Sequence, residues 1–468
     1  MDKTETPTSN EHEHAIAKEA ELADVDDYVP GTDEEKALVR KIDLYILPLM
    51  FLMYLLSYMD RTNIGNAKIA GMDRDLNLDS ERYSIALVVF FIGYVVFEVP
   101  SNMIFSRTRP SVFLPCIMAA WGAVTIGMAF TPSYGVLIGL RALMGCIESG
   151  FAPGVLYLLS SWYKKEEQSK RFAVYISAAI LSGAFGGILA GTITSGLHEA
   201  NGIAGWRWLF VIEGAATVVT AGAAFFILPD FPESTSGSKF NQRERELAIK
   251  RIRSEVLATS AEEGPKLGHW TALKLSMVNW RTWLFVVGYM AIVGSSTLSY
   301  FYPTLVNGLG YTSTAAQYMT IPIYGVAFVC TATTGYFADQ HSQWRGLILG
   351  AWLTVSMLCA VVTCAVYDFT ARYALLVVMA SGLWASNALS LSYASVNFGD
   401  MPNETKAVSL AFVNAMGNLA QIYGAYLFPS SGAPEYLMGF GFISGLCLTG
   451  VASYVALHVF LRRASRSV

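Results

Sequence analysis

The sequence predicts an all-α membrane protein with twelve transmembrane helices arranged in two six-helix halves. Hydrophobic residues make up 53% of the 468 residues and charged residues only 15%. The mean hydropathy of +0.42 is outside the usual range of soluble globular proteins of this length. A bilayer core needs about 20 consecutive apolar residues per helix. Twelve such segments are present, and one long polar segment separates the sixth from the seventh.

The expected spans follow one another with only short polar breaks within each half. In the first half they are 44–67, 83–105, 113–130, 134–162, 171–197 and 208–228. In the second half they are 283–302, 317–338, 346–366, 373–398, 405–428 and 436–461. We therefore expect a first bundle over 41–228, a central loop over 229–280, a second bundle over 281–461 and a basic tail over 462–468.

The acidic stretch 1–40 is too polar to pack, so we expect it to be disordered. It also lacks the basic start and apolar run of a signal peptide. The central loop contains a segment, 242–257, that mixes charged and apolar residues at helical spacing. This pattern fits a helix on the inner membrane surface with its basic residues toward anionic lipid, and it fits a solvated linker equally well.

The distribution of Lys and Arg predicts that both termini are cytoplasmic, because inner loops carry an excess of these residues. With the N-terminus inside, the inner loops and the tail contain Arg107, Arg109, Lys164, Lys165, Lys170, Arg171, Arg345, Lys406, Arg462, Arg463 and Arg466. The outer loops have few basic residues, apart from Lys68, Arg74 and Arg82 in the first, where acidic residues surround them.

Two loop and helix motifs resemble those of the major facilitator superfamily. Gly335 to Arg345, with Asp339 between them, is similar to the loop motif in which Asp and Arg latch inner helix ends. In the first-half counterpart Phe105 stands where the Asp is expected. Arg141 to Gly150, which includes Glu148, resembles the arginine motif of the fourth span. The resemblance implies the superfamily's fold and a gating role for Asp339 and Arg345.

Four further strings are similar to the anion:cation symporter family, and especially to its fungal allantoate permease branch. They are 58–67 (YMDRTNIGNA), 97–102 (FEVPSN), 162–167 (WYKKEE) and 205–214 (GWRWLFVIEG). Members of that family carry organic anions such as allantoate, nicotinate, pantothenate and biotin, commonly with protons. The resemblance implies the same class of activity here, without specifying the anion.

Charged residues inside the expected spans mark the candidate pathway, because charges in a membrane span are rare and usually functional. The carboxylates are Asp60, Glu98, Glu148 and Glu213, and the arginines are Arg61 and Arg141. At about 1.5 Å per residue, Asp60 and Arg141 lie at a similar depth, roughly 10 Å below the outer face of a ~30 Å core. Glu148 follows Arg141 by nearly two turns and shares its face.

Adjacent residues on a helix point about 100° apart, so Asp60 and Arg61 must face different partners. We expect Asp60 to pair with Arg141, and Arg61 to bind a substrate carboxylate or, without it, Glu148. Glu148 is then the proton carrier, with Asp60 and Arg141 assisting. The histidines lie in the tail, in loops or near a span end, so the coupled proton must be carried by a carboxylate. A static ion-pair network that only fixes helix packing is the alternative.

Polar and aromatic residues at helical spacing complete the expected lining of the substrate path. They are Tyr58, Asn63, Tyr94, Trp384, Asn387, Asn414 and Asn418. Such side chains also join helices within lipid. Glu98 and Glu213 lie near span ends and fit gating or packing contacts better, and Glu98 is our candidate gating residue in the first half.

The function that fits these observations is proton-coupled uptake of a small organic anion by a monomer in the plasma membrane. An exporter of drugs or secondary metabolites has the same fold, although the fifth span lacks the Gly-Pro pair typical of proton antiporters. A nutrient sensor is a third interpretation, but it usually has a long folded extension. No enzyme motif, no metal-ligand spacing among the six cysteines, no cofactor and no nucleic-acid partner is indicated.

The sequon Asn403-Glu404-Thr405 tests the topology. If the loop that contains it is cytoplasmic, the asparagine stays unmodified when the protein is made in a eukaryotic cell, and glycosidase treatment leaves the electrophoretic mobility unchanged. A sequon engineered between Asp79 and Ser80, in the first outer loop, is the positive control. Glycosylation at Asn403 would contradict the assigned orientation.

Overall fold

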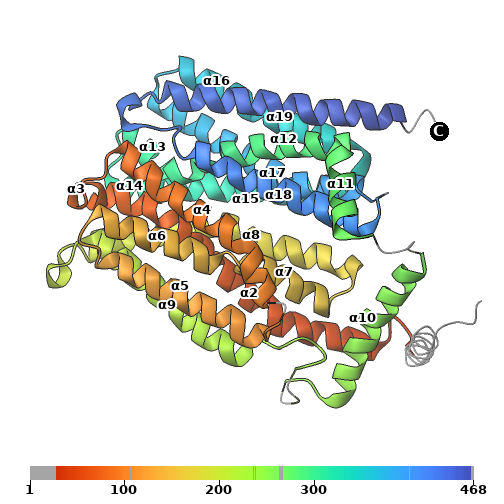
Figure 1. Cartoon of the computed structure of the whole chain (residues 1–468). Helices are drawn as coiled ribbons and strands as arrows, with labels where there is room; N and C mark the ends of the chain where they lie inside the picture. Colours follow the sequence, from red (N-terminus) through yellow and green to blue (C-terminus); the bar gives the residue numbers. More distant parts are fainter. Residues whose placement is uncertain are drawn as a thin grey trace, which may run out of the picture.

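The computed structural model describes residues 28–105, 107–235, 237, 239–262, 267–399 and 401–464, and these form two bundles of helices. The first half occupies the lower part of Figure 1 and the second half the upper part. The first-half helices are α2 (Asp33–Ala67), α4 (Ser80–Phe105), α5 (Pro110–Ala129), α6 (Tyr134–Glu148), α7 (Phe151–Trp162), α8 (Lys165–Gly196) and α9 (Gly205–Ile227).

The second half repeats this plan after two helices of the central loop, α10 (Gln242–Glu262) and α11 (His269–Val278). Its longer helices are α12 (Trp280–Ser296), α15 (Thr320–Gln340), α16 (Arg345–Ala365), α17 (Phe369–Asn397), α18 (Asn403–Gly424) and α19 (Leu437–Ala464). Short helices α3 (Asp73–Asp75), α13 (Tyr302–Gly308) and α14 (Ser313–Tyr318) lie at the end of the molecule away from α10. We call the end that carries α10 and α11 the linker end, and the other the opposite end.

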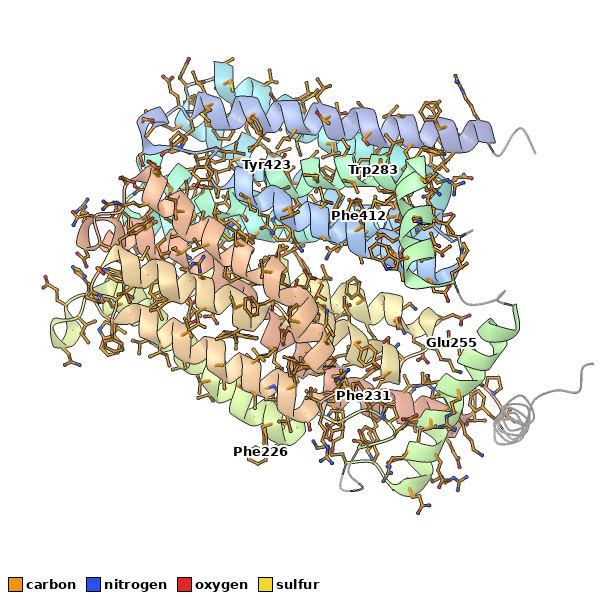
Figure 2. The ribbon with its side chains drawn as sticks, viewed as in Figure 1. Phe226, Phe231, Glu255, Trp283, Phe412 and Tyr423 are labelled. Atoms are coloured by element: carbon orange, nitrogen blue, oxygen red, sulfur yellow. The ribbon has the colours of Figure 1, made fainter. Side chains whose placement is uncertain are left out.

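Within the described residues, eleven helical segments are long and apolar enough to cross a membrane. The eleventh expected span, 405–428, is helical as α18 but is not one of them, because Asn, Gln and charged residues lower its hydropathy. Side chains still pack α18 into the bundle: the rings of Trp283 on α12 and Phe412 on α18, both labelled in Figure 2, have centroids 5.7 Å apart.

The first helix begins closer to the N-terminus than the sequence suggested. α2 begins at Asp33, inside the stretch 1–40 that we expected to be disordered, and the Thr32 hydroxyl caps it by accepting from Glu35 N–H at 3.2 Å. The reason is that Glu35 is buried and binds Lys164 and Arg251. Residues 1–27 and 465–468 lie outside the described part, so our expectations for them stay predictions.

α10 is attached to the first half by ion pairs, which neither of our two interpretations of the central loop anticipated. Arg251 is fully buried and donates to Glu35 at 3.1 Å and to Glu167, at the start of α8, at 2.5 Å. Lys41 of α2 binds Glu244 at 2.7 Å. Arg251, the basic residue of α10 in these pairs, is thus neutralised by protein carboxylates instead of lipid headgroups.

Hydrogen bonds that join the two halves cluster at the opposite end. Ser84 donates to Ala425 O at 2.7 Å, Tyr83 to Tyr300 O at 3.1 Å and Ser313 to Ile69 O at 2.7 Å. Figure 1 shows the halves closest together at this end, near α3, α13 and α14. The halves are therefore sealed to one another at the opposite end.

Small residues permit the close contacts of α8 with α14 and α15. A Cβ added at Gly187 would lie 2.7 Å from Gln317 O, and one added at Gly183 would lie 2.2 Å from the Tyr324 ring. The Gly-rich run of the fifth span, residues 183–191, thus serves helix packing. Helix contact across the halves depends on the absence of side chains at these positions.

Replacing Arg251 by Met tests the attachment of α10. It leaves Glu35 and Glu167 without their buried partner, and breaking a buried ion pair costs about 3–5 kcal/mol. We expect faster amide hydrogen exchange throughout α10 and a lower unfolding temperature. Arg243→Met is the matched control, because the Arg243–Glu34 pair is exposed on both sides and such pairs contribute ~0–1 kcal/mol. Equal effects of the two substitutions would contradict the assignment.

Candidate functional site

The centre of the first half contains a buried ion pair between α2 and α6. Arg61 Nε donates to Glu148 Oε1 at 2.8 Å, and the Ser57 hydroxyl, one turn earlier on α2, donates to the same oxygen. Glu148 is fully buried and Arg61 is 8% exposed. This is the pairing that the sequence predicted for Arg61 in the absence of substrate.

Glu148 lies where the fourth expected span breaks. α6 ends at Glu148 and α7 begins at Phe151, so the expected span 134–162 is one apolar segment, as predicted, but its helix is interrupted at residues 149–150. The break lets Gly150 meet α4 closely, since a Cβ there would lie 2.0 Å from Ser101 Oγ. Because Glu148 is the last residue of α6, its carboxylate is held at a helix end within the bundle.

Aromatic rings surround the guanidinium of Arg61. Its Cζ lies 5.0 Å from the ring centre of Tyr94, 5.3 Å from that of Tyr58 and 5.5 Å from that of Phe90. Arg61 Nη2 and Glu148 Oε2 are buried and have no hydrogen-bond partner within the described residues. The guanidinium therefore keeps one unused donor group, held in a fixed direction by cation–π contacts.

Arg141 does not form the expected pair with Asp60. It is buried on α6 and makes long contacts with the carbonyl oxygens of Ala86, at 3.4 Å, and Arg61, at 3.5 Å. Its Cζ lies 5.2 Å from the Phe90 ring. The depth estimate gave the position of each residue along the helix axis, but not the direction of its side chain around that axis. Asp60 faces away from α6 because the adjacent Arg61 occupies that side.

Asp60 instead faces α5 and α9. Its Oδ2 accepts from Trp121 Nε1 at 3.2 Å and from Thr217 Oγ1 at 2.9 Å. One turn further along α2, Asn63 Nδ2 donates to Glu213 Oε2 at 2.5 Å. Asn63, which we expected in the substrate path, thus binds a carboxylate inside the first half.

Tyr58 connects Arg61 to the second half. Its ring lies 6.2 Å from that of Trp384 on α17, and Trp384 lies 6.4 Å from Tyr324 on α15. Both Tyr58 and Trp384 remain partly exposed although they contact each other across the halves. That exposure is therefore toward the space between the halves.

The remaining residues predicted for the path lie on second-half helices and on α4. Asn387 of α17 accepts from Tyr289 at 3.4 Å, and Asn418 of α18 accepts from Gln421 at 3.3 Å. Asn414 and Asn418 are partly buried, and no hydrogen bond links them to Arg61, so their substrate role stays a prediction. Glu98 is partly buried on α4, and its gating role also stays a prediction.

The expected latch in the second half is formed. Arg345 Nη2 donates to Asp339 at 3.0 Å, and Arg345 Nε donates to Ala338 O at 3.2 Å. Asp339 is largely exposed, so the carbonyl bond of the buried Arg345 fixes the helix ends as much as the ion pair does. The gating role of this latch stays a prediction.

Sequence reasoning missed several neutral residues that complete the site. Ser57 could have been found, since it precedes Arg61 by one turn on the same face. Phe90, Trp121, Thr217 and Tyr324 come from other helices, and their contacts depend on tertiary packing. No group of three His, Cys, Asp or Glu residues in the described ranges is placed to hold a metal ion.

Comparison with known proteins identifies the class of protein that this fold and site define. The family model for the Major Facilitator Superfamily matches residues 50–425. The chain belongs to the major facilitator superfamily and is a multi-pass membrane protein of the transporter class. This confirms the all-helical membrane fold that the sequence predicted, while the count of twelve spans and the cytoplasmic termini stay predictions.

Two fungal relatives and one solved structure show how far the similarity extends. The chain is 36% identical to the "MFS transporter prlL" of a fungal species, over 96% of this chain and 94% of that one. It is 28% identical to the "High-affinity nicotinic acid transporter" of Saccharomyces cerevisiae, over 92% of this chain and 80% of that one. A bacterial homolog of the human lysosomal transporter Spinster, in an inward-facing and unoccupied conformation, superposes with a TM-score of 0.67 at 16% identity, covering 90% of this chain and 95% of that one.

The stability of the Arg61–Glu148 pair is open to a double-mutant test. Glu148→Leu leaves Arg61 buried without its carboxylate and is expected to cost about 3–5 kcal/mol, whereas Arg61→Met with Glu148→Leu recovers most of that loss. Thermal unfolding of the purified protein in detergent measures both. Asp339→Leu is the control: it removes the exposed partner of Arg345 and should lower the free energy of unfolding by ~0–1 kcal/mol. Additive single effects would show that the two side chains are not coupled.

Proposed function

We propose that the protein transports a small organic anion, a carboxylate of the nicotinate, pantothenate or allantoate type, together with a proton. The observation that carries this proposal is the state of Arg61. It is a buried cation with an unused donor nitrogen, placed within aromatic rings and next to a partly exposed contact between the two halves. A carboxylate can accept hydrogen bonds from two nitrogens on one edge of a guanidinium. Glu148 accepts from only one nitrogen of Arg61, through one of its oxygens, so the other nitrogen is left for a ligand.

The coupling follows from competition for Arg61. When a substrate carboxylate binds the guanidinium, Glu148 loses part of the interaction that favours its ionised form. A buried carboxylate without its cation is expected to take up a proton. Anion binding and proton binding then assist one another, which is a reciprocal coupling of two sites.

The seal at the opposite end supports transport by alternating access. If the linker end is cytoplasmic, as the Lys and Arg distribution predicts, the contacts of Ser84, Tyr83 and Ser313 close the path on the outer side. Breaking them and closing the linker end would expose Arg61 to the other side. Such a cycle needs no cofactor.

The relatives favour uptake of an organic anion. One of them is named as a nicotinic acid transporter and aligns over 92% of this chain. This agrees with membership of the anion:cation symporter family and its allantoate permease branch, and we further propose action as a monomer in the plasma membrane.

An uptake screen tests the function. The protein in proteoliposomes is given radiolabelled nicotinate, pantothenate, biotin or allantoate with an inward proton gradient, with and without a protonophore. We expect at least one anion to accumulate only with the gradient. Arg61→Gln should reduce uptake by at least tenfold, because losing the charge of a bidentate partner costs more than 1.4 kcal/mol.

Glu148→Gln separates transport from coupling. This variant keeps shape and polarity at Glu148 but cannot exchange a proton, so we expect anion exchange to persist while gradient-driven accumulation is lost. Glu81→Gln, at an exposed position at the start of α4, is the control for overall integrity. Full uptake by Arg61→Gln would overturn the role of Arg61 in binding the anion. Movement of the anion out of the vesicles in exchange for entering protons would overturn the proposed symport and favour export.

A further inference from the structure

The interface of α2 and α9 holds two carboxylates in a pair of crossed hydrogen bonds. Thr217 of α9 donates to Asp60 of α2 at 2.9 Å, and Asn63 of α2 donates to Glu213 of α9 at 2.5 Å. Asn63 follows Asp60 by three residues and Thr217 follows Glu213 by four. Residues at these spacings are neighbours, roughly 5–6 Å apart at Cβ. The geometry therefore places Asp60 and Glu213 about one helical turn from each other across the interface.

Neither carboxylate has a cationic partner among the described residues. The third donor, Trp121 Nε1, is neutral like Thr217 and Asn63. Asp60 is fully buried and Glu213 is 1% exposed. An ionised carboxylate in such surroundings costs several kcal/mol, and two of them at this separation also repel each other.

The nearby cations form no ion pair with either carboxylate within the described residues. Arg61 binds Glu148 on the other side of α2, and Arg207 of α9 donates to Ala129 O at 2.6 Å. Lys68 Nζ lies 4.2 Å from the centre of the Tyr83 ring.

Of the charged groups on α6, Arg141 and Glu148 act on Asp60 only at long range. The sequence of α5 has no charged residue, and that of α8 has none after Arg171. No cation therefore forms an ion pair with either carboxylate within the described residues.

Unused acceptor atoms lie within the same cluster. Asp60 Oδ1, Glu213 Oε1 and Asn63 Oδ1 are all buried and have no hydrogen-bond partner within the described part of the chain. A proton on one carboxylate supplies the missing donor and removes one negative charge at once. The cluster fits a proton better than it fits two free charges.

We propose that Asp60 and Glu213 share one proton across the α2–α9 interface, and that this pair is a second proton-binding site, separate from Glu148. Asp60 is adjacent to Arg61 in the chain, so one rotation of α2 changes the surroundings of both sites. The sharing of the proton stands on the geometry alone. Its use in the transport cycle rests on the proposed function.

The test is an infrared titration of the purified full-length protein in lipid, with no anion present. The protonated-carboxyl absorption of the wild type is followed across pH. Asp60→Asn and Glu213→Gln each leave one buried carboxylate, so each is expected to shift the pH midpoint of the same titrating band, and only the double variant to abolish the band, because a shared proton belongs to the pair. Glu81→Gln, an exposed carboxylate at the start of α4, is the matched control and should leave that band unchanged.

Two variants that keep both carboxylates guard against loss of folding. Thr217→Val and Trp121→Phe each remove one donor to Asp60, and both should shift the pH midpoint of the band without abolishing it. A double-variant loss about twice that of either single variant would overturn the shared proton, because independent sites add. So would loss of the band on adding Na⁺ at constant pH, which would identify a sodium site.

The outcome is distinguishable from failure of the proposed function. Because no anion is used, a negative uptake screen together with a shared band overturns symport and leaves the proton pair supported. Proton-driven uptake together with an unchanged band in Asp60→Asn and Glu213→Gln overturns the pair and leaves symport supported.

Discussion

The cost of burying charge in an apolar bundle governs the organisation of the first half. α2 carries an acid and a base at consecutive positions, and these point about 100° apart. Arg61 meets a carboxylate on α6, and Asp60 meets only neutral donors on α5 and α9. The arrangement of α5, α6 and α9 around α2 provides both sets of partners, so a rotation of α2 about its axis alters both environments together.

A contrast between the two faces of α2 gives the site its asymmetry. On the face toward α6, the Arg61 guanidinium binds the Glu148 carboxylate among aromatic rings, and one guanidinium nitrogen has no hydrogen-bond partner within the described residues. Toward α9, carboxylates meet only neutral donors. A ligand with a negative group suits the first environment, and a small positive ion suits the second. A helix with this pair of faces has separate places for an anion and its counter-cation.

Sequence alone predicted the all-helical fold, most helix positions and the Arg61–Glu148 contact, because hydropathy and helical spacing determine these directly. It failed on the Asp60–Arg141 pair, since depth along a helix axis was estimated but rotation about it was not. The interruption at Ser149 and Gly150 was missed because the segment 134–162 as a whole has the length and hydropathy of a single span. The attachment of α10 could not be foreseen, since Arg251 finds Glu35 and Glu167 only after folding.

The fixed position of α10 on the first half sets a limit on how the halves can separate. Between the last residue of α10, Glu262, and the first of α11, His269, the chain makes seven Cα-to-Cα steps. At most about 3.6 Å is gained per step, so those two helix ends can never be more than roughly 25 Å apart. The central loop is long in sequence, but it acts as a short tether whose reach bounds the widest opening at the linker end.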